Sequence, residues 1–176
     1  MDTSILFGPT WYRPHTIPGT NVALSGSTGY SQQISYGYQV LRTPAGNLWI
    51  ELNPMTFFSP GASTANIKGS FSPGGFLITP GVRYMVPVQS RLSLYAVAGG
   101  GVGTFDYPVV GAGDTPYVAT NDTWHGVFEF GGGIDIRLIR FLSVRAECRD
   151  FVTGKGLDGV PGRHHLAPAI GIATHF

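Results

Sequence analysis

Large apolar and small side chains alternate along the last segment of the chain, residues 166–176. One set of alternate positions is larger and mostly apolar: Leu166, Pro168, Ile170, Ile172, Thr174 and Phe176. The interleaved set is smaller: Ala167, Ala169, Gly171, Ala173 and His175. A period of two predicts a β-strand whose faces meet different surroundings. We expect the larger face to point outward, although a strand of a soluble sandwich would carry polar groups on its solvent side.

Similar segments recur along the chain and predict eight strands, at 4–13, 30–42, 47–58, 74–87, 91–105, 123–138, 142–153 and 163–176. Tight links at 43–46, 88–90 and 139–141 alternate with long links rich in Gly, Pro, Ser, Thr and Asn, at 14–29, 59–73, 106–122 and 154–162. Short turns on one side and long loops on the other are typical of outer-membrane barrels. The pattern therefore predicts an all-β fold, an eight-stranded antiparallel up-and-down transmembrane β-barrel, with residues 1–176 forming a single domain.

An even number of strands returns both termini to the side of the short turns, which is the periplasmic side of an outer-membrane barrel. The sequence predicts a protein of the bacterial outer membrane with periplasmic termini. No signal peptide precedes the first predicted strand, so for an exported protein we interpret the chain as the mature form with an added initiator methionine.

Charged residues inside the predicted strands fall almost wholly on one face. In 123–138 and 142–153 that face alternates with one carrying residues such as Phe128, Ile134 and Val144. An apolar surround would force the charges into the lumen. The predicted lumen network contains four residues of each sign: Glu51, Arg83, Glu129, Asp135, Arg137, Arg145, Glu147 and Arg149. Across the 139–141 hairpin, a register that places Arg137 opposite Ser143 also places Asp135 opposite Arg145.

Ions removed from water must be paired, so equal numbers of each sign predict a mutually neutralising girdle. Eight strands leave an interior just wide enough for side chains. The sequence therefore favours a plugged, charge-paired lumen over an open ion-selective pore, and leaves limited passage of small solutes open.

Composition supports a membrane barrel. Only 12% of the 176 residues are charged, about half the value of roughly 25% that is usual for soluble domains. Mean hydropathy is +0.11, yet no run approaches the ~18 apolar residues of a transmembrane helix. The net charge of +1 gives no reason to expect nucleic acid as a partner. The single cysteine, Cys148, excludes an internal disulfide.

Aromatic residues at the strand ends predict two interfacial belts, as a bilayer favours. The belt beside the long loops contains Trp11, Tyr12, Phe58, Phe76, Phe105, Tyr107 and Trp124, and the belt beside the short turns contains Phe7, Tyr84, Phe141 and Phe176. Trp49 departs from this pattern, because the alternation around it predicts an inward side chain.

The ending Gly171-Ile172-Ala173-Thr174-His175-Phe176, with the segments 145–151 and 163–165, resembles the small eight-stranded bacterial outer-membrane barrels, the class of the OmpA transmembrane domain and OmpX. The resemblance implies that Phe176 is the signal read by the barrel-assembly machinery. It also implies a monomer surrounded by outer-membrane lipid and lipopolysaccharide, with no cofactor. The long loops could then bind an extracellular partner.

Two kinds of lipid A enzyme share this architecture, and the sequence gives no specific signature of either. The deacylase kind uses a His with a Ser two positions later, whereas His165 is followed by Leu166 and Ala167. The palmitoyl-transferase kind needs His, Asp and Ser near the outer rim; His15 and Asp122 show no informative spacing. We predict no catalytic residue and no enzyme, with a lipid-A-modifying enzyme kept as an alternative.

Two further alternatives follow from residue types. His164 and His165 would point to opposite faces of a strand, so we predict no metal site. A soluble lipocalin-like ligand-binding barrel is the other alternative, and it requires an apolar lumen and a polar exterior.

Overall fold

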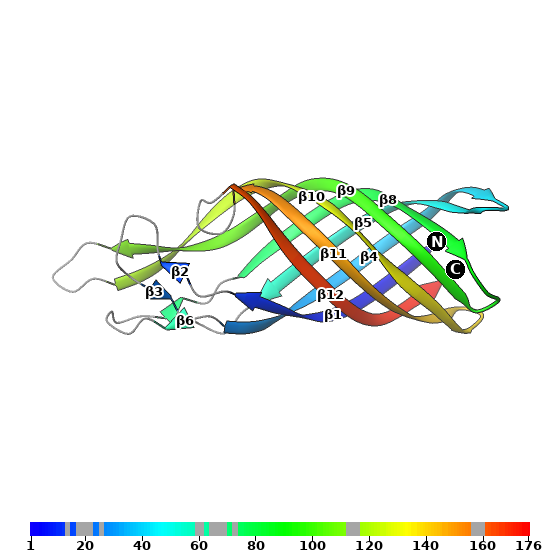
Figure 1. Cartoon of the computed structure of the whole chain (residues 1–176), viewed down its shortest axis with the longest axis horizontal. Helices are drawn as coiled ribbons and strands as arrows, with labels where there is room; N and C mark the ends of the chain where they lie inside the picture. Colours follow the sequence, from blue (N-terminus) through cyan, green and yellow to red (C-terminus); the bar gives the residue numbers. More distant parts are fainter. Residues whose placement is uncertain are drawn as a thin grey trace.

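The computed structural model describes the backbone of residues 1–12, 15–16, 23–24, 27–58, 62–63, 70–71, 74–111, 117–155 and 161–176. Eight long antiparallel strands close into a barrel (Figure 1). They are β1 (Asp2–Tyr12), β4 (Ser27–Thr43), β5 (Gly46–Phe58), β8 (Gly74–Pro87), β9 (Leu92–Gly111), β10 (Tyr117–Ile139), β11 (Leu142–Lys155) and β12 (Pro161–His175). Each strand pairs with the long strand next to it in the chain, and β1 also pairs with β12 over Asp2–Phe7 and Ile170–His175, which closes the barrel.

The predicted fold class and all eight predicted strands are confirmed. The strands extend further than predicted where hairpins continue beyond the rim. The β9–β10 pairing runs on to Gly111 and Tyr117, so most of the predicted link 106–122 is strand. The two chains of such a hairpin satisfy each other's backbone groups without help from the barrel. Much of the other predicted long links lies outside the described residues.

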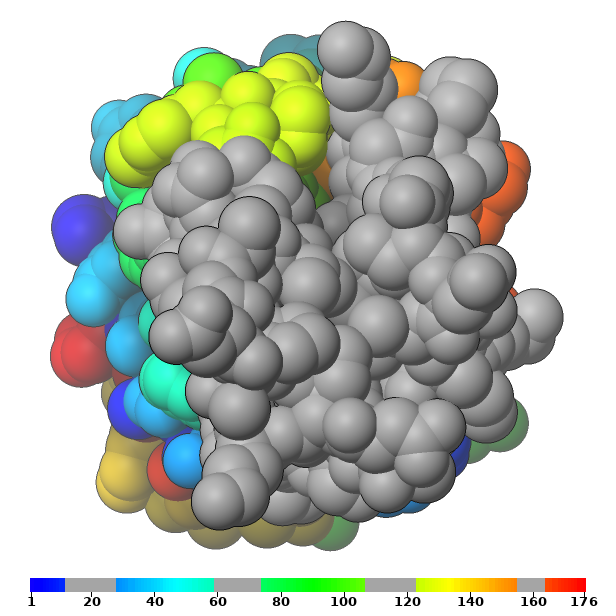
Figure 2. Space-filling model, turned by 90° about the vertical axis from the view of Figure 1, so that its left-hand side faces the viewer, coloured from blue at the N-terminus to red at the C-terminus, as the bar shows by residue number. Residues whose placement is uncertain are grey.

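The two ends of the barrel differ. The tight links 44–45, 88–91 and 140–141 lie at one end, together with both termini (Figure 1), and we call this the turn end. There the Phe176 backbone N–H donates to the Met1 carbonyl at 2.9 Å. The opposite loop end carries two short strand pairs, β2 (His15–Thr16) with β3 (Ala23–Leu24) and β6 (Ala62–Ser63) with β7 (Ser70–Phe71). Figure 2 shows the molecule from the loop end. In the described part of the chain, no helix is long and apolar enough to cross a membrane.

The outer surface of the barrel is apolar. Phe128 is 53% exposed and Ile170 60% exposed, whereas Ala167 and Ala173 on the opposite strand face are buried. The same outward orientation is found for Ile5, Phe7, Tyr36, Ile50, Leu52, Val82, Leu94, Phe130, Ile134, Ile136, Leu166 and Ile172. This exterior is the opposite of what the lipocalin alternative requires.

The interior is filled by side chains in layers along the barrel axis. Near the turn end, Trp49, Met85, Tyr95 and Val97 pack together. The buried charged residues lie beside this group, since Arg83 contacts the Trp49 and Tyr95 rings and Glu147 accepts a hydrogen bond from Tyr95. In the loop half, an apolar layer consists of Met55, Leu77, Phe105, Val127, Phe151 and Ala167. Trp49 is buried, as its inward orientation requires.

The predicted aromatic belt beside the long loops is wrong at Phe105. It is 2% exposed and lies inside the barrel, with its ring centroid 5.7 Å from that of Phe57 and 5.8 Å from that of His165. The reason is strand parity, because Phe105 shares the inward face of β9 with Tyr95 and Val97. Position at a strand end does not override the alternation.

Two inward glycines make room for the charged layer. A Cβ at Gly133 would lie 2.5 Å from the ring of Tyr95, and a Cβ at Gly37 would collide with the side chains of Asp2 and Arg83. The missing side chains at Gly133 and Gly37 therefore leave space that Tyr95, Asp2 and Arg83 occupy.

Candidate functional site: an ionic cluster across the lumen

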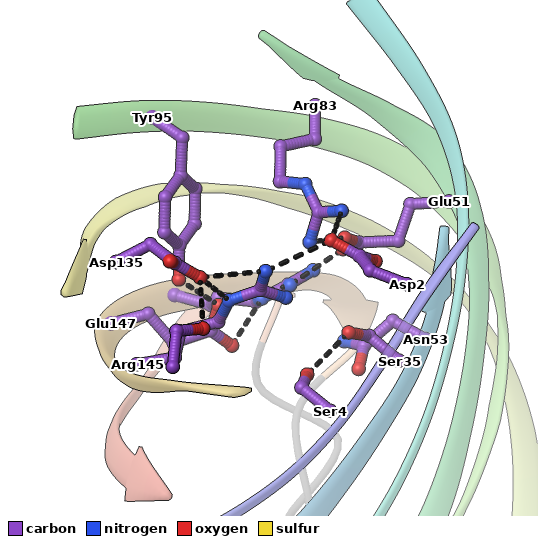
Figure 3. Close-up of polar contacts among 12 residues, drawn as sticks. Asp2, Ser4, Ser35, Glu51, Asn53, Arg83, Tyr95, Asp135, Arg145 and Glu147 are labelled. Atoms are coloured by element: carbon purple, nitrogen blue, oxygen red, sulfur yellow. Dashed lines mark hydrogen bonds and ion pairs between the residues drawn. The ribbon is translucent and has the colours of Figure 1, made fainter. Parts of the chain in front are cut away.

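Three buried arginines and five buried carboxylates form one network inside the barrel, which we call the lumenal cluster (Figure 3). Arg83, Arg145 and Arg149 are each 0% exposed. The carboxylates are Asp2, Glu51, Glu129, Asp135 and Glu147. These residues come from β1, β5, β8, β10 and β11, so the cluster joins strands that are not neighbours in the sheet.

Arg149 is the most connected member. Its guanidinium lies 2.6 Å from Glu51, 3.2 Å from Glu129 and 2.7 Å from Glu147. Charge-assisted hydrogen bonds of this kind are stronger than neutral ones, and the planar guanidinium suits several carboxylates at once. One side chain therefore links β5, β10 and β11 through the middle of the barrel.

Asp2 connects the other two arginines. Its Oδ2 lies 2.5 Å from Arg83 Nη2 and 2.9 Å from Arg145 Nη2. Arg145 also binds Asp135 at 2.9 Å, and Arg83 reaches Glu51 at 2.7 Å. The ion pairs thus run without interruption from Asp135 through Asp2 and Glu51 to Arg149.

The lumenal cluster carries more negative than positive groups. Five carboxylates against three guanidiniums leave a formal charge of −2. Neutral side chains donate hydrogen bonds to three of these carboxylates. The Tyr95 hydroxyl donates to Glu147 at 2.8 Å, the Asn53 amide to Glu129 at 3.1 Å and the Ser143 hydroxyl to Asp135 at 3.0 Å. Hydrogen bonds of this kind offset part of the cost of burying the ions, whereas Asp2 Oδ1, Arg83 Nε and Arg145 Nη1 have no hydrogen-bond partner among the described residues.

Aromatic rings pack against two of the arginines, Arg83 and Arg145. The Arg83 guanidinium lies 5.2 Å from the centre of the Trp49 ring and 5.8 Å from that of Tyr95. Arg145 lies 5.5 Å from the Tyr95 ring. Cation–π contacts are stronger where water is excluded, as it is here. The rings hold the guanidiniums in place and fill space that would otherwise admit solvent.

The structure places seven of the eight predicted network residues in the lumenal cluster, and it corrects the eighth. Arg137 is exposed at the turn end and makes no ion pair among the described residues. It sits next to a register shift between Arg137 and Ile139, where β10 leaves the lumen. The predicted register of Arg137 with Ser143 and Asp135 with Arg145 is confirmed.

Asp2 was missed by the sequence analysis, because the first strand was expected to begin at residue 4. The alternation of Asp2, Ser4 and Leu6 with Thr3, Ile5 and Phe7 is the signal that could have found it. The predicted balance of four charges of each sign is therefore wrong in composition, since Asp2 replaces Arg137.

Ser143, His175 and Asp135 have the composition of a hydrolase triad but not its geometry. Ser143 Oγ lies 2.9 Å from His175 Nε2, yet the carboxylate of Asp135 lies 3.8 Å from that same nitrogen. In a triad the carboxylate orients the other ring nitrogen. Here Ser143 also donates to Asp135, which is occupied by Arg145. The arrangement is an extension of the ionic network.

The two histidines of β12 face opposite ways, as expected. His164 is exposed on the outer wall, with Nδ1 2.6 Å from Asp150, whereas the His165 ring stacks on Phe105 inside the barrel. Within the residues that the structure describes, no group of three or more His, Cys, Asp or Glu could hold a metal ion.

No protein-family model and no curated protein sequence matches the chain. Solved structures resemble it along their whole length. Neisserial surface protein A has a TM-score of 0.62 and 13% identity, covering 99% of this chain and 96% of that one. The outer membrane enzyme PagL has a TM-score of 0.59 and 11% identity, covering 100% of both chains. Ail, the attachment invasion locus protein of Yersinia pestis, has a TM-score of 0.54 and 14% identity, covering 99% and 98%.

These likenesses define the fold. It is that of the small eight-stranded outer-membrane β-barrels, as the resemblance to the OmpA transmembrane domain and OmpX led us to expect. The chain has this fold with a lumen that contains buried charge pairs.

Proposed function

We propose that this protein is an integral outer-membrane barrel with a closed lumen, which holds its long loops at the cell surface. The termini and tight turns lie in the periplasm, and the role is structural or one of surface interaction, with at most limited passage of small solutes. The observation that carries the proposal is the inverted arrangement of side chains, with apolar residues outside and a continuous ionic network inside.

The apolar outer wall supports membrane insertion. A barrel in water would expose this surface at a large cost in free energy, at roughly 25 cal/mol per Å² of apolar area. In lipid the same surface is satisfied, and the closed ring pairs the backbone of each long strand with those of its two neighbours. Lipid and lipopolysaccharide are then the partners of this wall.

Two layers support a closed lumen. The lumenal cluster spans the barrel from β1 and β5 to β10 and β11, with its arginines fully buried. Beyond it, the apolar layer around Phe105 and Phe151 fills the loop half. Hydrated ions would have to displace both, which costs either ion pairs or apolar contacts.

Phe176 is 86% exposed at the end of the chain, where a periplasmic assembly factor can reach it. This exposure supports its proposed role as the signal for the barrel-assembly machinery. The monomeric state and an extracellular partner for the loops belong to the same proposal. We assign no reaction to the chain, since the Ser143 group lacks triad geometry.

Planar-bilayer recording of the purified, refolded protein tests the closed lumen. We expect little or no steady conductance. Large, stable, ion-selective openings would contradict the proposal. Membrane placement is tested separately, by cell fractionation and by the heat-dependent gel shift of folded barrels. Recovery in the aqueous fraction without detergent would argue against membrane insertion.

A further inference from the structure

A cavity of about 310 Å³ opens at the turn end of the barrel, and we call it the vestibule. Its wall is formed by β4, β5, β8, β9, β10, β12 and the 88–91 link, so it occupies the mouth of the barrel. Trp49 and Asp135 line it as well, and both contact the lumenal cluster. The vestibule therefore ends on the lumenal cluster, to which Asp135 itself belongs.

Three arginines line the vestibule: Arg42, Arg91 and Arg137. None of the three makes an ion pair within the described part of the chain. The only acidic side chain in the wall is Asp135, and it is occupied by Arg145 and Ser143. The vestibule thus presents three guanidiniums without ion-pair partners among the described residues, next to a lumenal cluster with a formal charge of −2.

Two of these arginines oppose each other across neighbouring strands. The Arg137 backbone N–H donates to the Arg91 carbonyl at 2.7 Å, one step beyond the pairing of Ile136 with Leu92. Like charges directly opposite each other destabilise a sheet. An anion between the two guanidiniums would convert this repulsion into attraction.

Arg42 reaches the vestibule because of a bulge. The register of β4 and β5 shifts between Gln39 and Leu41, which moves Leu41 to the exposed outer side. Arg42 then pairs with Asn47 on the inward face, and both residues line the cavity. Bulges redirect side chains in this manner at barrel rims. Without the shift, regular alternation from Gln39 would direct Arg42 outward.

The vestibule also contains an unused buried donor. Trp49 is 8% exposed, and its indole Nε1–H has no hydrogen-bond partner among the residues that the structure describes. A buried donor without a partner costs free energy, and an acceptor in the vestibule would remove that cost. The three guanidiniums and this N–H are all donors, so the matching ligand presents only acceptors and carries negative charge.

We propose that the vestibule is a binding site for a phosphate group. Guanidinium forks bind phosphate oxygens in pairs, and several arginines around one cavity match a group with more than one negative charge. The volume exceeds the ~30 Å³ of a water molecule about tenfold, which leaves room for a phosphate and part of the molecule that bears it. The group belongs either to a soluble phosphate compound or to a phospholipid head group at the barrel rim.

Exposure of this site to the periplasm rests on the proposed function, whereas phosphate binding does not. Titration calorimetry of the refolded protein in dodecyl maltoside, a detergent without phosphate, tests binding of inorganic phosphate. A second arm compares nanodiscs of phosphatidylglycerol with nanodiscs of an uncharged glycolipid. Both arms follow the Trp49 indole N–H resonance by NMR.

We expect a saturable shift of the Trp49 resonance with inorganic phosphate, with phosphatidylglycerol, or with both. The Arg91→Gln/Arg137→Gln variant should bind at least about tenfold more weakly, given the strength of hydrogen bonds to charged groups. Arg42→Gln should weaken binding on its own. The matched control is Arg140→Gln, an exposed arginine of the turn end that does not line the vestibule, and it should bind as the wild type does.

A response to inorganic phosphate identifies a soluble ligand, and a response confined to phosphatidylglycerol identifies a lipid head group. Absence of a saturable response in both arms, or equal affinity of wild type and Arg42→Gln, would overturn the proposal. Neither result would alter the fractionation and conductance tests of the proposed function.

Discussion

At the scale of single residues, arginine and carboxylate members of the lumenal cluster are not equivalent. Each arginine serves two or three acids, whereas the acids already exceed the guanidiniums in number. Removal of Arg149 leaves Glu129 and Glu147 without a guanidinium partner among the described residues. Neutralisation of one acid reduces the surplus of negative charge and leaves hydrogen-bonding capacity in place.

We expect Arg149→Met to destabilise the barrel by about 3–5 kcal/mol, the usual effect of breaking a buried ion pair from one side. Asp2→Asn should cost less, about 1–2 kcal/mol, because Arg83 keeps Glu51 and Arg145 keeps Asp135. Urea unfolding in lipid vesicles measures both, with Arg140→Ala as an exposed control. Equal losses for the two variants would contradict the charge surplus.

The same residues show how far sequence reasoning reaches. Alternation identified Glu51, Arg83, Glu129, Asp135, Arg145, Glu147 and Arg149 as inward, because each lies well inside a strand. It failed at Asp2 and Arg137, which lie at strand ends. There the side-chain environment depends on where pairing starts and on a register shift, and neither is encoded by a period of two.

At the scale of elements, each strand separates lipid from lumen by its alternation alone. The presence of each strand could be predicted because one strand face contacts lipid and the other the lumen, so apolar side chains alternate with polar or small ones. Strand ends were not, since the β9–β10 hairpin continues without barrel neighbours and its length depends only on local pairing. Phe105 shows the same limit. It was predicted to lie in the outer aromatic belt because it is near a strand end, but its place in the alternation directs it into the lumen.

A charge on the outer face of β12 should therefore be costly. Ile170 projects outward in the middle of the strand, between Ala169 and Gly171. We expect Ile170→Lys to lose about 2–4 kcal/mol in vesicles, the usual cost of a lysine near the bilayer midplane. Val88→Lys in the turn-end link should change stability by less than about 0.5 kcal/mol. Equal unfolding of both variants and wild type would argue against a lipid-facing wall.

At the scale of the whole molecule, two separate layers of side chains close the lumen. The lumenal cluster and the apolar layer lie at different heights and depend on different forces, so loss of one layer leaves the other in place. The number of strands, which sets this narrow lumen, followed from the count of alternating segments. The order of the layers did not follow from sequence, because it depends on the stagger of the strands.

We expect Phe105→Ala/Phe151→Ala to remain electrically silent in planar bilayers, since the ionic network still spans the lumen. The variant should lose stability, because truncation of a buried Phe costs about 3–5 kcal/mol. Its folding is checked by the heat-dependent gel shift. Steady conductance from a folded double variant would show that the apolar layer is the sole barrier.

The β9–β10 hairpin extends beyond the barrel as a two-stranded ribbon. Beyond the last rung shared with β8, at Gly75 and Phe105, the two strands stay paired from Phe105 and Thr123 to Gly111 and Tyr117 (Figure 1). Six further steps at about 3.3 Å each raise the tip roughly 20 Å above the rim. In the proposed orientation, with the loop end outside the cell, this ribbon would extend away from the membrane surface.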